Sequence, residues 1–268
     1  MAKKAIAGGE IYYEDTGAGE PLIFVSGLNG IARGWQSQVA FFSTRFRVIT
    51  YDHRGTGSSD KLQRAFSIDQ MTAELVALLD VLDIERAHVV GLSTGGAIAQ
   101  TLGIVHPGRV KRLVMCSTWT HCDPWFRRLF EARRAMYQQC GPELHSMFHP
   151  LWLFPAGYVN AHDAEIDEER RRAVAAAPPV EVSIGRIEAL LNFDRRAGLA
   201  RIKAPTLVLA ADDDYITPSY HARALADAIP HATLEIFEGG GHSIPKTRAD
   251  AFNRRVIDFL TEVGGSPG

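Results

Sequence analysis

The sequence predicts an α/β protein built on a doubly wound, mostly parallel sheet. Short apolar runs alternate along the chain with longer segments whose apolar residues recur at helical spacing, and this alternation favours parallel strands joined by helices. Several short runs, among them 22–25 and 206–210, are continuously apolar, as expected of inner strands covered on both faces. The expected strands cover residues 11–13, 22–25, 47–51, 88–91, 112–116, 206–210 and 233–237.

Helices are expected at four places between or after these strands. Before the first of them, Ser67 is followed three residues later by Gln70, which is the arrangement of a capping box at a helix start. Apolar residues then recur at helical spacing as far as Leu82. The expected helices cover residues 68–82, 94–106, 222–229 and 250–260.

The alternation of strands and helices stops between about residues 119 and 196. This stretch is rich in Arg, Trp and Phe at helical spacing, contains no convincing strand, and is interrupted by several prolines. We therefore expect a helical cap that lies over the sheet. The predicted organisation is a first core segment over residues 1–118, a cap over 119–198 and a second core segment over 199–268.

Composition excludes several classes of partner. Of the 268 residues, 29 are Lys or Arg and 31 are Asp or Glu, so the net charge of −2 provides no general attraction for nucleic acid or anionic lipid. The three cysteines are too few for a disulfide framework. No secretory signal and no apolar stretch long enough to span a membrane is recognised. We expect a cytoplasmic protein that acts on a small molecule, as a monomer or homodimer.

The segment from His88 to Ala97 carries the strongest functional signal. An expected strand runs into Gly91-Leu92-Ser93-Thr94-Gly95, and a helical pattern follows at once. This is the context of a nucleophile elbow, in which small residues must flank a serine on a tight, strained turn. The start of the helix also brings backbone N–H groups close to the serine oxygen. The pattern predicts that Ser93 is a nucleophile.

A general base and an orienting acid follow the serine in the order that such a nucleophile requires. The strand at 206–210 ends in three consecutive aspartates, Asp212 to Asp214, and the last strand ends in a glycine-rich loop that carries His242. Residues just beyond the carboxyl ends of parallel strands meet at one edge of a sheet. The sequence alone leaves open which of the three aspartates orients His242.

These segments resemble the α/β-hydrolase fold family over nearly the whole chain. Besides the serine elbow, the resemblance covers Phe24-Val25-Ser26-Gly27-Leu28-Asn29-Gly30, Tyr51-Asp52-His53-Arg54-Gly55-Thr56-Gly57-Ser58, Asp214-Tyr215-Ile216-Thr217-Pro218 and Gly241-His242. It implies that the helical cap is inserted after the sixth strand. It also implies that the catalytic acid is Asp214, four residues before a proline. The backbone N–H groups of Leu28 and Thr94 would form the oxyanion hole, although Ser26 replaces the usual histidine of that loop.

Within that family, the serine elbow is similar to that of 3-oxoadipate enol-lactonases, while the cap looks more like that of aminoacrylate hydrolases of pyrimidine degradation. The resemblance therefore implies hydrolysis of an ester or lactone bond in a small carboxylated metabolite, through a Ser-His-Asp triad and an acyl-enzyme. Two alternatives remain. One is cleavage of a C–N or C–C bond on the same scaffold, and the other is a ligand-binding receptor without catalysis.

Candidate substrate contacts lie in or next to the expected cap. An arginine of the first cap helix, such as Arg127 or Arg133, could pair with a substrate carboxylate, and Trp119 leaves a strand end where it could wall the pocket. His145 and His149 are four residues apart, but without a third ligand nearby in sequence they favour packing over metal binding. No glycine motif of a nicotinamide or flavin site follows the first strands. We expect neither cofactor nor metal.

Overall fold

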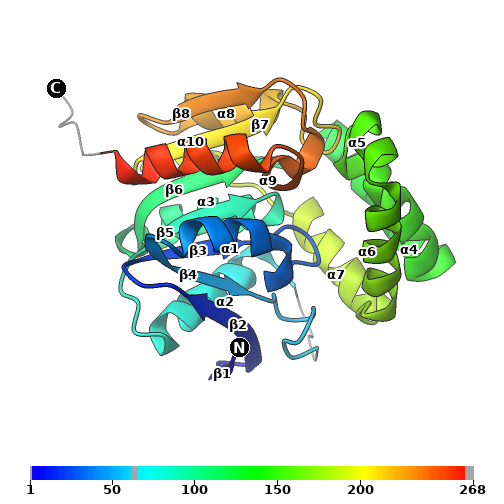
Figure 1. Ribbon diagram of the computed structural model, residues 1–268, viewed down its shortest axis with the longest axis horizontal. Coiled ribbons are helices and arrows are strands. Elements are labelled where there is room, and N and C mark those ends of the chain that lie inside the picture. The colour runs from blue at the N-terminus through cyan, green and yellow to red at the C-terminus, as the bar shows by residue number, and fades with distance from the viewer. Residues whose placement is uncertain (1, 62–65, 263–268) are drawn as a thin grey trace.

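The computed structural model describes residues 2–61 and 66–262 and confirms the predicted fold class. Its sheet has the strand order β1-β2-β4-β3-β5-β6-β7-β8, and the strands from β4 onward along this order run parallel while β1 and β2 are antiparallel to their neighbours (Figure 1). The strands are β1 (Ala2–Ile6), β2 (Gly9–Thr16), β3 (Glu20–Val25), β4 (Phe46–Tyr51), β5 (Ala87–Leu92), β6 (Val110–Cys116), β7 (Thr206–Ala211) and β8 (Thr233–Phe237).

All seven expected strands are present, and the one that sequence reasoning missed is β1. Its residues are almost entirely exposed and it pairs only with β2 at the edge of the sheet, so it carries neither an apolar run nor an alternating pattern. With β1 counted, the cap follows the sixth strand, as the resemblance implied.

Helices cover both faces of the sheet. The helices outside the cap are α1 (Gln36–Phe42), α2 (Ile68–Val81), α3 (Thr94–Val105), α8 (Tyr220–Ala228), α9 (Ile244–Thr247) and α10 (Ala249–Thr261). Apolar residues of α1 and α10 pack with Leu22 and Phe24 of β3, whereas α2, α3 and α8 pack with Ile23 and Val25. Successive residues of β3 therefore face opposite halves of the core, which explains why this strand is apolar throughout.

The start of α2 confirms the predicted cap residue. The Ser67 hydroxyl accepts a hydrogen bond from the backbone N–H of Gln70 at 3.0 Å. Replacing Ser67 with alanine leaves that N–H without its acceptor, so we expect the free energy of unfolding to fall by about 1 kcal/mol. Urea denaturation of the Ser67→Ala protein measures this change, and Ser67→Asp is the control because aspartate caps equally well. Equal losses in both variants would contradict the capping role.

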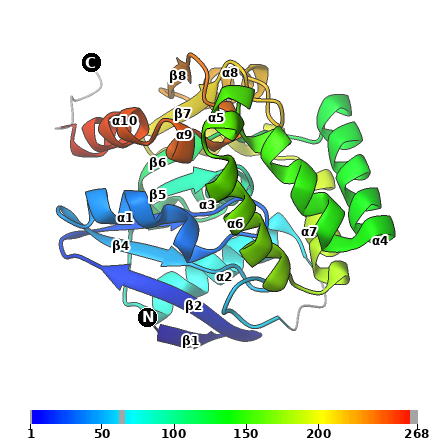
Figure 2. The same cartoon turned by 45° about the vertical axis from the view of Figure 1, so that its right-hand side comes forward.

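The cap is formed by four helices between β6 and β7. They are α4 (Pro124–Leu153), α5 (Ala156–Ala161), α6 (Asp163–Ala175) and α7 (Val180–Leu191), and they gather on one side of the sheet (Figures 1 and 2). Within α4 the backbone leaves helical geometry at Gly141, where φ is 71°, so its two arms can face each other. The boundaries predicted at 119 and 198 stay predictions. No helix of the described segments is long and apolar enough to cross a bilayer.

Candidate active site

Ser93 sits on a strained turn between β5 and α3. Its φ of 55° and ψ of −115° lie outside the regions that serine ordinarily adopts. Hydrogen bonds hold it there, because its N–H donates to the carbonyl of Cys116 at 2.9 Å and its carbonyl accepts from the Thr118 hydroxyl at 2.8 Å. This geometry is that of the nucleophile elbow that the motif predicts.

The two glycines of the elbow are required by close backbone contacts. A Cβ at Gly91 would collide with the carbonyl of Gly95, and a Cβ at Gly95 would collide with the carbonyl of Val25. Gly95 therefore lets α3 approach the end of β3, which brings the Ser93 side chain beside Gly27. A Cβ placed on Gly27 would lie 3.3 Å from Cβ of Ser93.

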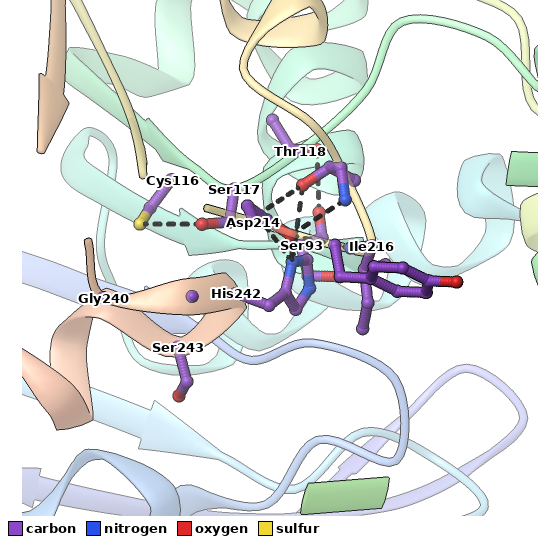
Figure 3. Close-up of polar contacts among 12 residues, drawn as sticks. Ser93, Cys116, Ser117, Thr118, Asp214, Ile216, Gly240, His242 and Ser243 are labelled. Atoms are coloured by element: carbon purple, nitrogen blue, oxygen red, sulfur yellow. Dashed lines mark hydrogen bonds and ion pairs between the residues drawn. The ribbon is translucent and has the colours of Figure 1, made fainter. Parts of the chain in front are cut away.

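His242 and Asp214 form a buried pair beside this serine (Figure 3). His242 lies in the loop after β8, and its Nδ1 is 3.0 Å from Oδ1 and 2.9 Å from Oδ2 of Asp214. The carboxylate also accepts from the backbone N–H groups of Ile216 and Thr217 at 2.8 and 2.9 Å, and from the Thr217 hydroxyl at 2.9 Å. With Nδ1 engaged in this way, Nε2 of His242 remains to exchange a proton with another group.

Asp214 is held in its ionised form. Burial raises the pKa of its carboxyl, but the charge of His242 and the hydrogen bonds from His242 and Thr217 outweigh that effect and leave the pKa below its ordinary value. An ionised partner fixes the proton of His242 on Nδ1 and stabilises the imidazolium that forms when Nε2 is also protonated.

The depressed pKa of Asp214 predicts how stability responds to acid. The carboxylate stabilises the fold fully above the ordinary aspartate pKa near 3.9, and this stabilisation is lost as the pH falls from there through the lower folded-state value. Urea unfolding at a series of acidic pH values should therefore show a steeper loss in the wild type than in Asp214→Asn. Parallel pH dependences in the two proteins would contradict this.

The two neighbouring aspartates brace the loop that carries His242. Oδ1 of Asp212 accepts from the backbone N–H of Gly239 at 2.8 Å, and Oδ1 of Asp213 accepts from that of Gly241 at 2.7 Å. Both side chains belong to exposed residues, whereas Asp214 is buried. Of the three aspartates, the structure therefore places Asp214 against the imidazole.

The two backbone N–H groups expected to form the oxyanion hole lie in the loop after β3 and at the start of α3. In the described part of the chain, the backbone N–H groups of Leu28 and Thr94 donate to no acceptor, and both residues are next to a residue of the Gly27–Ser93 contact. Ser26 stabilises this loop in its own way, because its hydroxyl donates to the carbonyl of Ile31 at 3.2 Å and accepts from Nε1 of Trp35 at 2.9 Å. Two amides are thus free to stabilise a negative oxygen.

The cap contacts three of the loops that carry predicted catalytic groups. All three contacts join a residue of α4 to the loop after β3, β7 or β8. They are Asn29 Nδ2 donating to Tyr137 Oη at 3.3 Å, Trp125 Nε1 donating to the Tyr215 carbonyl at 3.0 Å, and the Leu153 carbonyl only 2.6 Å from where a Cβ on Gly241 would lie. The cap therefore contacts the loops that carry the histidine, the acid and the expected oxyanion donor Leu28.

Arg133 is a buried cation on the inner side of the cap. Only 3% of it is exposed, and its guanidinium lies over the rings of Phe130 and Trp152, at 4.7 and 4.9 Å from their centroids. Its Nε lies 3.4 Å from Nε2 of His145, whose pKa is lowered to about 2 by burial and by the charge of Arg133. Among the described residues no carboxylate pairs with Arg133, so its charge is uncompensated.

The other two candidate substrate contacts lie elsewhere. Arg127 is exposed on the same helix, where its neighbour Phe126 turns inward, so the guanidinium is in solvent. Trp119 is fully buried and stacks on Phe126 with the ring centroids 4.4 Å apart, next to the edge of Phe193. Its surroundings are those of a packing residue under the cap.

Sequence reasoning missed that the two arms of α4 face each other. His145 stacks on Tyr137 with the centroids 3.9 Å apart, and Trp152 lies across Arg133. The charges of Arg133 and His242 both act on His149, whose pKa burial lowers to about 3, so this second histidine is neutral and near the site. The kink at Gly141 brings the two arms of α4 together, and the spacing of residues along the sequence does not reveal it.

Within residues 2–61 and 66–262, no group of three or more His, Cys, Asp or Glu could hold a metal ion.

Comparison with known proteins finds a matching family model, similar sequences and a similar solved structure. Residues 20–249 match the family model described as "alpha/beta hydrolase fold". The chain is 36% identical over 254 residues to a protein of Azorhizobium caulinodans named "Putative carbamate hydrolase RutD", covering 95% of this chain and 96% of that one. A protein of the same name from Caulobacter sp. (strain K31) is 37% identical over 243 residues, covering 90% and 91%. The enol-lactonase structure from Burkholderia xenovorans LB400 superimposes with a TM-score of 0.90 at 29% identity, covering 97% and 100%.

Proposed function

Because the chain belongs to the alpha/beta hydrolase fold family, we propose that it hydrolyses an acyl C–N bond of a small metabolite through Ser93, His242 and Asp214. The observation that carries this proposal is the buried His242–Asp214 pair beside a serine held at positive φ. A nucleophile, a base and an ionised acid in this arrangement are suited to acyl transfer. The relatives that are named carbamate hydrolases support C–N cleavage over the ester or lactone alternative.

In the first step, Oγ of Ser93 attacks the carbonyl carbon of the substrate while Nε2 of His242 takes the hydroxyl proton. The N–H groups of Leu28 and Thr94 donate to the oxygen that becomes negative, and one such donor contributes about 3 kcal/mol to transition-state stabilisation. The C–N bond then breaks, and His242 returns the proton to the leaving nitrogen. The acyl group remains on Ser93.

In the second step, water attacks the acyl-enzyme and His242 again takes the proton. Collapse of the tetrahedral intermediate breaks the bond to Oγ of Ser93, which regains its proton from the imidazolium. Asp214 stabilises the imidazolium in both steps. The products are an amine or ammonia and an acid, and the enzyme returns to its starting state.

Ester or lactone hydrolysis by the same residues is the second candidate, and the superposition on an enol-lactonase favours it. A set of substrates that share one acyl group and differ only in an amide, carbamate, ester or lactone bond separates the two. We expect the highest kcat/KM for a C–N substrate. Turnover of esters and lactones alone would establish the second candidate, and tight binding without any turnover would indicate a receptor.

Arg133 is the residue that we propose to bind a substrate carboxylate. A buried guanidinium without a carboxylate partner is costly, and an anionic substrate would compensate its charge at the moment of binding. Replacing Arg133 with glutamine should lower kcat/KM by about 10²-fold for a carboxylated substrate, since charge-assisted hydrogen bonds are the strong ones. Steady-state kinetics on the acid and on its neutral methyl ester measures the effect.

The neutral ester separates charge recognition from general damage. Its kcat/KM should change by less than about threefold in Arg133→Gln, because it has no carboxylate to lose. Arg128→Gln is the matched control, because this arginine is exposed on the same helix. If Arg133→Gln lowers kcat/KM equally for the acid and for the ester, Arg133 does not recognise a substrate charge.

A cytoplasmic location, a small-molecule substrate and a monomeric or homodimeric state remain expectations of this proposal.

A further inference from the structure

A second buried arginine lies where the cap meets the core on the side of β4. Arg186, on α7, is fully buried, and its Nη1 donates to the carbonyl of Arg54 at 3.1 Å. The contact between cap and core is close here, because a Cβ on Gly55 would lie 2.9 Å from Cγ1 of Val182. The guanidinium is also 5.8 Å from the ring centroid of Phe66. Arg186 is therefore enclosed between α7 and the loop after β4.

Several donors at this place have no acceptor. Nε and Nη2 of Arg186 are sealed from solvent and find no hydrogen-bond partner among the described residues, and the same is true of the hydroxyls of Tyr51 and Ser183. Ser183 precedes Arg186 by one turn of α7, so both lie on one side of that helix. Tyr51 is near enough for the charge of Arg186 to act on its phenol. Leaving such groups unpaired in the interior destabilises the fold.

The charges at this junction do not balance. Glu74 is the carboxylate whose charge acts on Arg186, but its Oε1 is already occupied by Arg54, which donates to it from Nε at 2.8 Å and from Nη2. His53 adds no further positive charge, because burial and Arg186 lower its pKa to about 3 and keep it neutral. Two guanidinium groups thus share one carboxylate in a buried place, which leaves one positive charge in excess.

We propose that Arg186, Tyr51 and Ser183 bind a small monovalent anion at the junction of cap and core. A guanidinium offers only donors, and two hydroxyls that can also donate are beside it. A water molecule could accept from the guanidinium and donate to the two hydroxyls, but it would leave the excess positive charge uncompensated, whereas an anion accepts from all of these groups and neutralises that charge. The ligand is a halide or the carboxylate of a small acid, since both have this chemistry.

The site is separate from the triad and does not depend on the proposed reaction. Arg186 and Ser183 belong to the cap, whereas Tyr51 ends a core strand. An anion held by all three therefore ties α7 to the core and stabilises the docked cap.

Thermal unfolding tests this inference at constant ionic strength, with chloride, bromide or formate replacing gluconate, an anion too large for an enclosed site. In the wild type we expect Tm to rise by about 3 °C for each tenfold increase in anion concentration above Kd. Arg186→Met, which keeps an unbranched side chain but removes the guanidinium, should lose this rise in Tm, while Arg128→Met should keep it. If Arg186→Met fails to fold, Tyr51→Phe replaces it as the test variant, and we expect a smaller rise in Tm with anion concentration than in the wild type. A halide-only response identifies a solvent ion, and a formate response identifies a carboxylate site.

A bromide-soaked crystal gives a direct view. We expect one anomalous peak within about 3.5 Å of Nε or Nη2 of Arg186 in the wild type. The inference is overturned by ordered water in place of that peak, by the absence of any anion-specific rise in Tm, or by an equal rise in Arg186→Met and the wild type.

Discussion

Replacing Ser93 with alanine is expected to lower kcat by about 10⁴-fold or more while the protein stays folded. The hydroxyl oxygen is the atom that bonds to the acyl group, so its removal ends covalent catalysis. Only the rate enhancement that the oxyanion donors and substrate binding supply then remains. The backbone contacts that hold the turn use the N–H and carbonyl of Ser93, and alanine keeps both. Steady-state turnover of the best C–N substrate, together with circular dichroism and Tm, measures the two effects.

Ser117→Ala is the matched control for this variant. Ser117 is buried directly after β6, and the one hydrogen-bond partner that its hydroxyl has among the described residues is Sγ of Cys116 at 3.7 Å. We expect its kcat to stay within about threefold of the wild type, since it touches no group that reacts. A Ser93→Ala protein that is folded and retains near-native turnover would exclude the acyl-enzyme mechanism.

Replacing Asp214 with asparagine should lower kcat by about 10⁴-fold, although Asp214 does not itself bond to the substrate. The amide preserves the size of the side chain but removes the charge that stabilises the imidazolium. It can also donate to Nδ1, which places the proton of His242 on the wrong nitrogen. The pH profile of kcat/KM and the turnover at neutral pH together report this change.

The adjacent aspartate provides the control. Asp212→Asn keeps an oxygen that can accept from the N–H of Gly239, so kcat should change by less than about threefold. If Asp212→Asn impairs turnover as severely as Asp214→Asn, the acid has been assigned to the wrong residue.

The core strands and the order of the candidate serine, acid and histidine along the chain were predictable because both depend on local sequence patterns. Continuous apolar runs mark strands that are covered on both faces, and the turn at Ser93 needs glycine at fixed positions whatever surrounds it. The edge strand Ala2–Ile6 escaped prediction because it is exposed and buries almost no side chain. The choice of Asp214 over Asp212 came from the family resemblance, since spacing treats three consecutive carboxylates alike.

The cap was predictable only as a helical region. Arg127 and Arg133 belong to one helix and cannot be ranked from composition, yet one is in solvent and the other is 3% exposed between two aromatic rings. That difference follows from the bend at Gly141, which turns the second arm of α4 back over the first. The excess charge at Arg186 likewise arises only when α7 packs on the core, and no sequence window contains both sides of that contact.

The most direct test of the central claim is intact-protein mass spectrometry after treatment with a fluorophosphonate. Attack by an activated Oγ of Ser93 on phosphorus displaces fluoride and leaves one stable adduct, as expected of a serine that has a general base at hand. We predict a single adduct on the wild type, none on Ser93→Ala, and slow labelling of Asp214→Asn. A folded wild-type protein that stays unlabelled, or a Ser93→Ala protein that is labelled as fast as the wild type, would contradict the account.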